Sequence, residues 1–347
     1  MQKTVLIFIC VVCTALCHSC GNAISEYKEP VFREKGQLDA VILNDTLDMF
    51  YPFEMAVSDN YVLVLASNGS SYLQAYDKCT GAYAGGFILK GRGPGEISSA
   101  GNMTFDGEEG IVSVYDPRTS KIVSYRLLED GLLELEYVSE KSFADIGKPL
   151  RRVWDLKEEG YFIDGQIGVE DGIQGRFQII NEDGLQSQWN RFPVDDETEK
   201  MAYFSTLSTI SPDRRHFADA TLYGAILETF ELSGGIISHG GCRRFLQPVF
   251  DFEDGVIVPK DKTTFGFTSL CATDDCIFGV YVGNSDADTF NNISTFDWNG
   301  KEMCRYETDC NNLRIGCHHA DDRKIYAVAA NPDRTFSLVY YDLDRAR

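Results

Sequence analysis

Short runs of β-branched and aromatic residues alternate with polar turn residues along almost the whole chain. The clearest runs are residues 61–65, 111–115, 161–163, 277–281 and 325–328. Runs of this length bounded by Gly, Pro, Asn, Asp or Ser predict β-strands. Beyond the N-terminal leader we find no long stretch with helical periodicity. The pattern therefore predicts an all-β chain.

The turn residues recur in series with a period of about 50 residues. One series ends on glycines, and its members are Gly81, Gly131, Gly184, Gly234 and Gly300. A second series comes one hairpin earlier, at residues 58–60, 106–108, 158–160, 211–213, 273–275 and 320–322. A third turn falls between them in most repeats. Three turns per period delimit four strands, which is one blade of a β-propeller. In the fourth repeat, residues 215–217 look like a poor strand.

The two series predict how many blades there are and how the ring closes. The first-turn series has six members and the glycine series five, because the chain ends soon after residues 338–341. Residues 38–43 form an unassigned strand ahead of the first blade, and pairing them with the last blade would remove an exposed edge. We therefore predict a six-bladed β-propeller of four-stranded antiparallel blades over residues 37–347, with longer loops in blades three and five. A tandem of β-sandwiches explains neither the steady period nor the truncated last repeat.

The N-terminus has the features of an export signal. Lys3 precedes an apolar run over residues 4–17, which is too short to span ~30 Å of hydrocarbon but suits a signal peptide. Ser19 and Cys20 follow as in a bacterial lipobox, so we expect residues 1–20 to be a lipoprotein signal peptide with Cys20 as the lipidated residue. Residues 21–36 would then be a tether. The alternative is an ordinary secreted protein cut near Ser19.

The net charge limits the classes of partner, and the cysteine content bears on whether the chain contains disulfides. The formal net charge is −21, and loss of residues 1–20, in which Lys3 is the one charged side chain, makes it −22. Such acidity argues against nucleic acid or anionic lipid as a partner. Seven cysteines remain after the leader, an odd number that cannot all pair within the chain. Cys271 and Cys276 flank a predicted turn and are a candidate disulfide, with buried thiols as the alternative.

The most distinctive local sequence is a glycine-rich hexapeptide between the first and second blades. It consists of Gly91, Arg92, Gly93, Pro94, Gly95 and Glu96. Gly-Lys-Ser/Thr is missing, Pro94 removes an amide, and no helix pattern follows, so a phosphate-binding loop is disfavoured. An interblade turn is the plain interpretation, in which Arg92 and Glu96 either pair with each other or face a ligand.

With this hexapeptide and the repeat rhythm, the chain resembles the TolB-like six-bladed β-propeller lipoproteins of Bacteroidetes. The resemblance covers the leader and all blades. It implies a lipid-anchored protein of the cell envelope with a binding role, and it supplies no catalytic residues. Residues 21–25 lack the acidic run that sends such lipoproteins to the cell surface, which favours the outer membrane on its periplasmic side.

No catalytic or metal motif emerges from the sequence. Cys310, Cys317, His318 and His319 lack zinc-ligand spacing, and adjacent histidines on a strand would point to opposite faces. The serine-hydrolase and metalloprotease signatures are absent. We therefore expect no cofactor and no metal, and a non-catalytic binding or scaffold module for an envelope protein, peptide or glycan. The alternative is a glycan-active hydrolase or lyase with acidic residues at the propeller channel, which would require two carboxylates ~5–10 Å apart.

Overall fold

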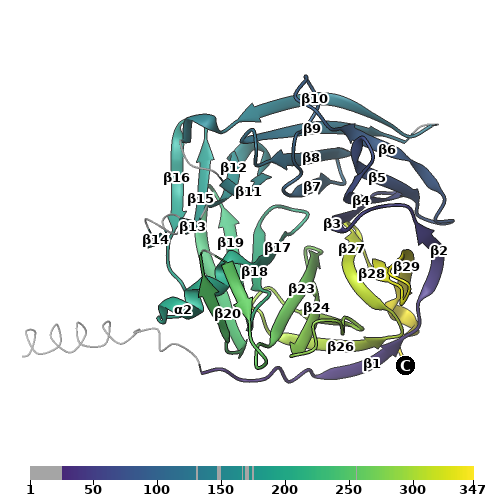
Figure 1. Cartoon of the computed structure of the whole chain (residues 1–347). Helices are drawn as coiled ribbons and strands as arrows, with labels where there is room; N and C mark the ends of the chain where they lie inside the picture. Colours follow the sequence, from purple (N-terminus) through teal and green to yellow (C-terminus); the bar gives the residue numbers. More distant parts are fainter. Residues whose placement is uncertain are drawn as a thin grey trace, which may run out of the picture.

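The computed structural model describes residues 26–129, 132–146, 150–165, 167–168, 172–173, 176–254 and 256–347. In these residues the strands form six antiparallel blades arranged as a ring (Figure 1). The described residues do not include the predicted signal peptide with Cys20, or residues 21–25 of the predicted tether. The described part of the chain has no helix long and apolar enough to cross a bilayer.

The strands of each blade follow one another from the inside of the ring outward. Blade one contains β3 (Pro52–Val57), β4 (Tyr61–Asn68), β5 (Ser71–Asp77) and β6 (Tyr83–Leu89). Blade two contains β7 (Met103–Asp106), β8 (Ile111–Asp116), β9 (Lys121–Leu128) and β10 (Glu134–Ser142). Blade three contains β11 (Leu150–Asp155), β12 (Tyr161–Gly165), β15 (Phe177–Asn181) and β16 (Gly184–Trp189).

The second half of the ring repeats the arrangement. Blade four contains β17 (Thr206–Ile210), β18 (His216–Thr221), β19 (Ala225–Ser233) and β20 (Ile236–Leu246). Blade five contains β23 (Phe265–Ala272), β24 (Ile277–Asn284), β25 (Asn292–Phe296) and β26 (Glu302–Thr308). Blade six contains β27 (Asn311–His318), β28 (Asp321–Ala330), β29 (Phe336–Asp342) and β2 (Val41–Leu47).

Ring closure is confirmed, with a shifted strand. β2 pairs antiparallel with β29, with Val41 opposite Tyr340 and Leu47 opposite Phe336. The closing strand thus lies a few residues later than the predicted residues 38–43. The preceding β1 (Glu34–Leu38) instead adds to blade five by pairing in parallel with β26. The sheet structure therefore begins inside the segment expected to be a tether.

The blades are held together by packing between their faces. Both faces of a blade are covered by its neighbours, so a middle strand such as β4 is an unbroken buried run rather than an alternating one. Between blades three and four, an aromatic cluster includes Phe162, Phe177, Phe217 and Phe230. The strand predicted to be poor is regular: β18 begins at His216 and is buried from Phe217 onward, because this cluster covers it.

The predicted glycine turns lie between the third and fourth strands of their blades. Gly81, Gly184, Gly234 and Gly300 have φ angles of 71°, 104°, 58° and 72°, which non-glycine residues rarely adopt. Gly131 lies outside the described residues. The prediction of one such turn per repeat is confirmed where it can be compared.

Additional elements gather where the inner strands begin, which we call the entry face. They are the β13 (Ile167–Gly168) and β14 (Gly172–Ile173) hairpin, α2 (Glu197–Lys200) with the 3-10 turn η3 (Met201–Phe204), and the β21 (Phe250–Glu253) and β22 (Val256–Pro259) hairpin. They lie between β12 and β15, between β16 and β17, and between β20 and β23. The extra chain length of blades three to five therefore lies at one end of the ring.

Candidate functional site

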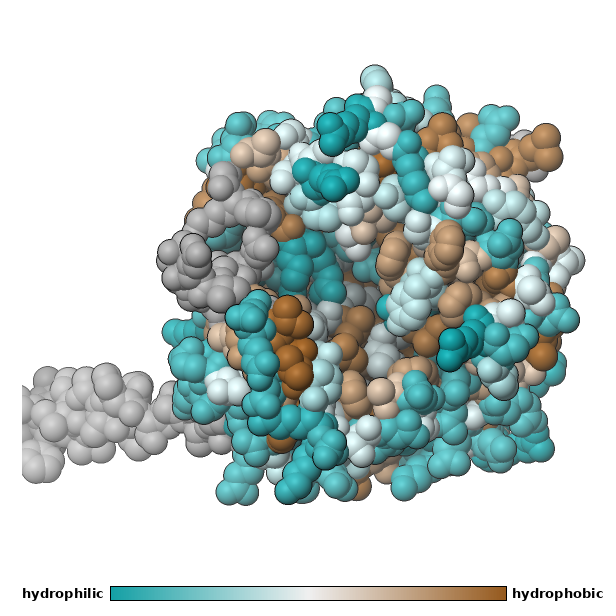
Figure 2. Space-filling view, viewed as in Figure 1, coloured by the Kyte–Doolittle hydropathy of each residue, from teal (hydrophilic) through white to brown (hydrophobic). Residues whose placement is uncertain are grey.

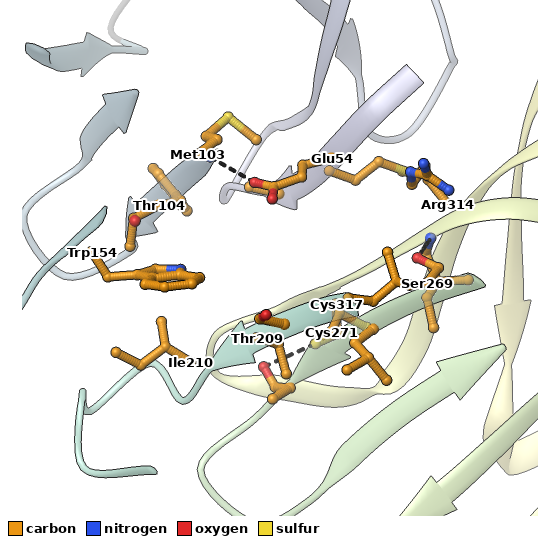
Figure 3. Close-up of a pocket in the computed structure, with 18 of the residues that line it drawn as sticks. Glu54, Met103, Thr104, Trp154, Thr209, Ile210, Ser269, Cys271, Arg314 and Cys317 are labelled. Carbon is orange, nitrogen blue, oxygen red and sulfur yellow. Dashed lines mark hydrogen bonds between the residues drawn. The ribbon is translucent and has the colours of Figure 1, made fainter. Parts of the chain in front are cut away.

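The inner strands of the six blades enclose a cavity of about 250 Å³ on the axis of the ring. Every blade contributes lining residues, from β3, β7, β11, β17, β23 and β27. Figure 3 shows the side chains of Glu54, Met103, Trp154, Thr209 and Arg314 around its open centre. The face seen in Figure 2 is hollowed near its middle, and both hydrophobic and hydrophilic surface reaches the hollow.

Glu54 of β3 is the carboxylate of this cavity. Its Oε2 accepts a hydrogen bond from the backbone N–H of Met103, at 2.6 Å, across the junction of blades one and two. Burial raises the pKa of Glu54 to about 7, while the Met103 amide and the nearby charges of Arg152 and Arg314 act in the opposite direction. The fold therefore holds Glu54 where its ionised form is disfavoured.

Two arginines flank Glu54 from other blades. Arg314 of β27 donates from Nε to the carbonyl of Phe53, at 2.6 Å, and from Nη1 to the carbonyl of Thr268, at 3.0 Å. Its guanidinium also lies 5.2 Å from the ring centroid of Tyr51. These partners are neutral, so they orient the Arg314 charge without cancelling it.

Arg152 of β11 approaches from the opposite side of the ring. Its Nη1 donates to Ser208 Oγ at 2.6 Å, and the same nitrogen lies 3.7 Å from Asp164 Oδ2. Asp164 is held more closely by Arg151, whose Nε donates to it at 2.6 Å. Ser208 Oγ donates in turn to Asp219, at 2.8 Å. The Arg152 side chain is thus fixed by a hydrogen-bonded network between blades three and four.

The far end of the cavity has a different composition. Arg214 donates from Nη2 to the carbonyl of Phe105, at 3.3 Å, beside the 2.6 Å ion pair of Lys157 with Asp106. His319 lies so close to Gly107 that a Cβ there would come within 2.1 Å of its Nδ1. Burial lowers the pKa of His319. This end is closely packed.

The histidine pair is arranged differently from the sequence prediction. His318 ends β27 and its Nε2 lies 2.8 Å from Asp59 Oδ1, while His319 is already in the following turn. Their ring centroids are therefore 4.3 Å apart, rather than on opposite faces of a strand. Among the residues that the structure describes, no group of three or more His, Cys, Asp or Glu is arranged to hold a metal ion.

The glycine-rich hexapeptide connects β6 to β7 and binds its own carboxylate. Glu96 Oε2 accepts from the N–H of Gly93, at 2.9 Å, and a Cβ at Gly91 would come within 1.9 Å of that oxygen. The absence of a side chain at Gly91 is thus what lets Glu96 fold over the loop. Arg92 and Pro94 are exposed. This geometry is that of an interblade turn, and Arg92 faces solvent.

The structure does not join the candidate disulfide pair. In the β23–β24 hairpin Cys271 lies opposite Phe278, whereas Cys276 lies in the turn beside Thr273. The two cysteines are therefore offset along the hairpin rather than facing each other. The structure shows the seven cysteines of the described residues as thiols.

The described lining of the cavity is rich in arginine and poor in carboxylates. Among the described residues that line it, Glu54 is the one carboxylate, beside three arginines, Arg152, Arg214 and Arg314. The pair of carboxylates that glycoside hydrolysis uses is not present in this lining. Two exposed aromatic side chains lie just ahead of β3, at the entry face: Phe50 is 68% exposed and Tyr51 51%.

Sequence reasoning missed Glu54, Arg152 and Arg314. The signal that would have found them is a charged residue inside the first strand of a repeat, where the neighbouring residues are apolar. Most of the described lining of the channel comes from these first strands, so a charge placed there is a candidate for ligand contact.

Comparisons with known proteins agree with this architecture. A model of the family described as TolB-like 6-blade propeller-like matches residues 31–318. Comparison with curated proteins gave no match.

Two solved structures from Bacteroides are similar in fold. The first, from Bacteroides fragilis and named as a candidate exported protein, has a TM-score of 0.56 at 13% identity and covers 92% of this chain and 98% of its own. The second, a DUF4221 family member from Bacteroides vulgatus, has a TM-score of 0.52 at 9% identity and covers 88% of this chain and 96% of its own. At these identities the likeness concerns the fold alone.

Proposed function

The chain belongs to the TolB-like six-bladed propeller family, and from that premise we propose that it is a non-catalytic binding module of the bacterial cell envelope. In this proposal Cys20 carries the lipid and the protein sits on the outer membrane facing the periplasm. Its ligand is a peptide or glycan that presents a carboxylate to the channel between Arg152 and Arg314. The export-type leader and the family support the location, and the cavity supports the ligand class.

The observation that carries the proposal is the position of Glu54. Its half-buried carboxyl lies in an open channel within reach of the charges of Arg152 and Arg314, and its pKa of about 7 leaves much of it protonated near neutrality. A protonated Glu54 can donate a hydrogen bond to a bound carboxylate, while the guanidinium groups of Arg152 and Arg314 supply the positive charge. An ionised Glu54 would repel the same ligand.

The enzymatic alternative has less support. A glycosidase of the usual kind needs a second carboxylate at a fixed distance from the first. The described lining of the cavity contains three arginines besides Glu54 and no second carboxylate. These can bind an acidic group but cannot act as a nucleophile or base at neutral pH.

Calorimetric titration tests the ligand class. The probes are a short peptide with a free C-terminal carboxylate and the same peptide with a C-terminal amide, together with galacturonate and galactose. We expect one of the carboxylate probes to bind and its neutral counterpart to bind at least tenfold more weakly, since a hydrogen bond to a charged group contributes about 1.5–3 kcal/mol.

The matched variants are Arg314→Gln and Arg92→Gln. Arg314→Gln should weaken binding by on the order of tenfold or more, whereas Arg92→Gln, which changes an exposed arginine of the interblade turn, should leave it unchanged. Equal effects of the two substitutions, or equal binding of the acid and its neutral counterpart, would show that the channel arginines do not select the ligand.

A further inference from the structure

The described lining of the channel contains two cysteines, which lie on neighbouring inner strands. Cys271 is on β23 of blade five and Cys317 is on β27 of blade six. Cys271 is buried and Cys317 half-buried. Figure 3 shows them next to each other at one side of the cavity.

The contacts between β23 and β27 place the two thiols at the same level. The N–H of Ile315 donates to Ser269 Oγ, at 3.0 Å. Two residues further along each strand come Cys271 and Cys317, and Cys317 Sγ donates to the carbonyl of Ala272, at 3.2 Å. Burial raises the pKa of Cys271, and the neighbouring Cys317 thiol acts in the same direction.

We propose that Cys271 and Cys317 form a disulfide that joins blade five to blade six in the exported protein. The inference goes beyond ligand binding, but it rests on the envelope location in the proposed function, because disulfides persist in oxidising compartments. A bond at this place would covalently link two adjacent blades across the channel wall. It also leaves an odd number of cysteines unlinked, as the total of seven requires.

The Cys271–Cys317 bond would form by thiol–disulfide exchange with an oxidant protein of the envelope that carries a disulfide. The Cys317 thiol, which is the more accessible of the two, loses its proton and attacks the oxidant's disulfide. This forms a mixed disulfide and releases one thiolate of the oxidant. Cys271 then loses its proton and displaces the second oxidant thiolate. Two thiols become one disulfide, and the two electrons reduce the oxidant to a dithiol.

Peptide mapping distinguishes this bond from the hairpin alternative. Protein is taken from the envelope fraction, its remaining thiols are alkylated, and it is digested without reduction by trypsin and an Asp-specific protease. These enzymes separate Cys271 in residues 263–273, Cys276 in residues 275–285 and Cys317 in residues 315–320. We expect residues 263–273 linked to residues 315–320, with Cys276 alkylated. A link between residues 263–273 and 275–285 would overturn the proposal.

Cysteine variants and a second protein sample test the inferred geometry separately from the native disulfide. The link should survive Cys276→Ser and disappear in Cys317→Ser, and reduction should lower the melting temperature of wild type but not of Cys317→Ser. Protein made in a reducing cytosol and then treated with diamide should gain the same link. Alkylated Cys271 and Cys317 after diamide would overturn the inferred geometry. The link after diamide but free thiols in envelope protein would overturn the native disulfide, while the inferred geometry and the envelope location would stand.

Discussion

Replacing Arg176 with methionine should destabilise the protein strongly, because this arginine is the buried cation of the interface between blades three and four. Its side chain is 3% exposed, and it forms ion pairs with Asp219 and Glu228, which are 1% and 2% exposed. Its guanidinium also lies 4.3 Å from the ring centroid of Tyr203. Methionine keeps much of the side-chain volume but leaves both carboxylates without their cation.

The magnitude follows from the cost of an uncompensated buried charge. Removing one partner of a buried ion pair costs about 3–5 kcal/mol. Lost contacts between the guanidinium and aromatic rings add roughly 0.5–2 kcal/mol. We therefore expect Arg176→Met to lower the free energy of unfolding by about 5 kcal/mol, measured by urea denaturation followed by tryptophan fluorescence at pH 7.5.

Two controls make this prediction specific. Arg215→Met, at an exposed arginine on the neighbouring β17–β18 turn, should change stability by less than about 0.5 kcal/mol. Adding Asp219→Asn and Glu228→Gln to Arg176→Met should recover part of the loss, because neutral partners cost less to bury. The reasoning would be refuted if Arg176→Met unfolded within 1 kcal/mol of wild type, or if the triple variant were no more stable than the single one.

Three further predictions concern the channel, the anchor and the closing strand. The pKa of Glu54 is raised to about 7 from an ordinary 4.5, so wild type should lose about 3 kcal/mol of stability as the pH rises from 4.5 through 7. Glu54→Gln should lack this loss. If urea denaturation gave the same change in the free energy of unfolding between pH 5 and pH 8 for both proteins, the prediction would be contradicted. If Cys20 is lipidated, the protein should partition into detergent and incorporate a fatty-acid analogue, and continued labelling of Cys20→Ala would rule the anchor out. A chain beginning at Val41 keeps β2 and should stay monomeric in size-exclusion chromatography, whereas one beginning at Asp48 exposes the edge of β29 and should self-associate; equal behaviour of the two would show that β2 does not protect that edge.

The blades could be predicted because their signals are local. A turn such as Asp77 to Gly81 needs a glycine at one position, and each strand lies within a few residues of its turn. The closing strand was predictable from a missing partner in the last repeat. β1 was missed because Glu34–Leu38 is a polar segment that adds to an outer edge, where little burial is required and no hydrophobic pattern marks it.

The channel site could not be predicted in the same way. Glu54, Arg152 and Arg314 lie on blades one, three and six, and only closure of the ring brings them to one cavity. The register of β23 against β27, which brings Cys271 to Cys317 rather than to Cys276, is likewise a property of how neighbouring blades pack. A hairpin can be read from adjacent residues, whereas a contact between inner strands of two blades cannot.

The charges around Arg176 and those around Glu54 are arranged differently, and the difference suggests a structural role for the first set and a binding role for the second. Around Arg176, every charge has an opposite charge beside it, and the arrangement is closed from solvent between two blades. Around Glu54, the flanking arginines are held largely by neutral oxygens, and the carboxyl is kept where its ionisation is disfavoured, next to an open cavity. Stability alone would favour a neutral side chain at Glu54, since the fold is weakened by its charge above pH 7. A residue that costs stability at the centre of a channel is the kind of position that ligand binding explains.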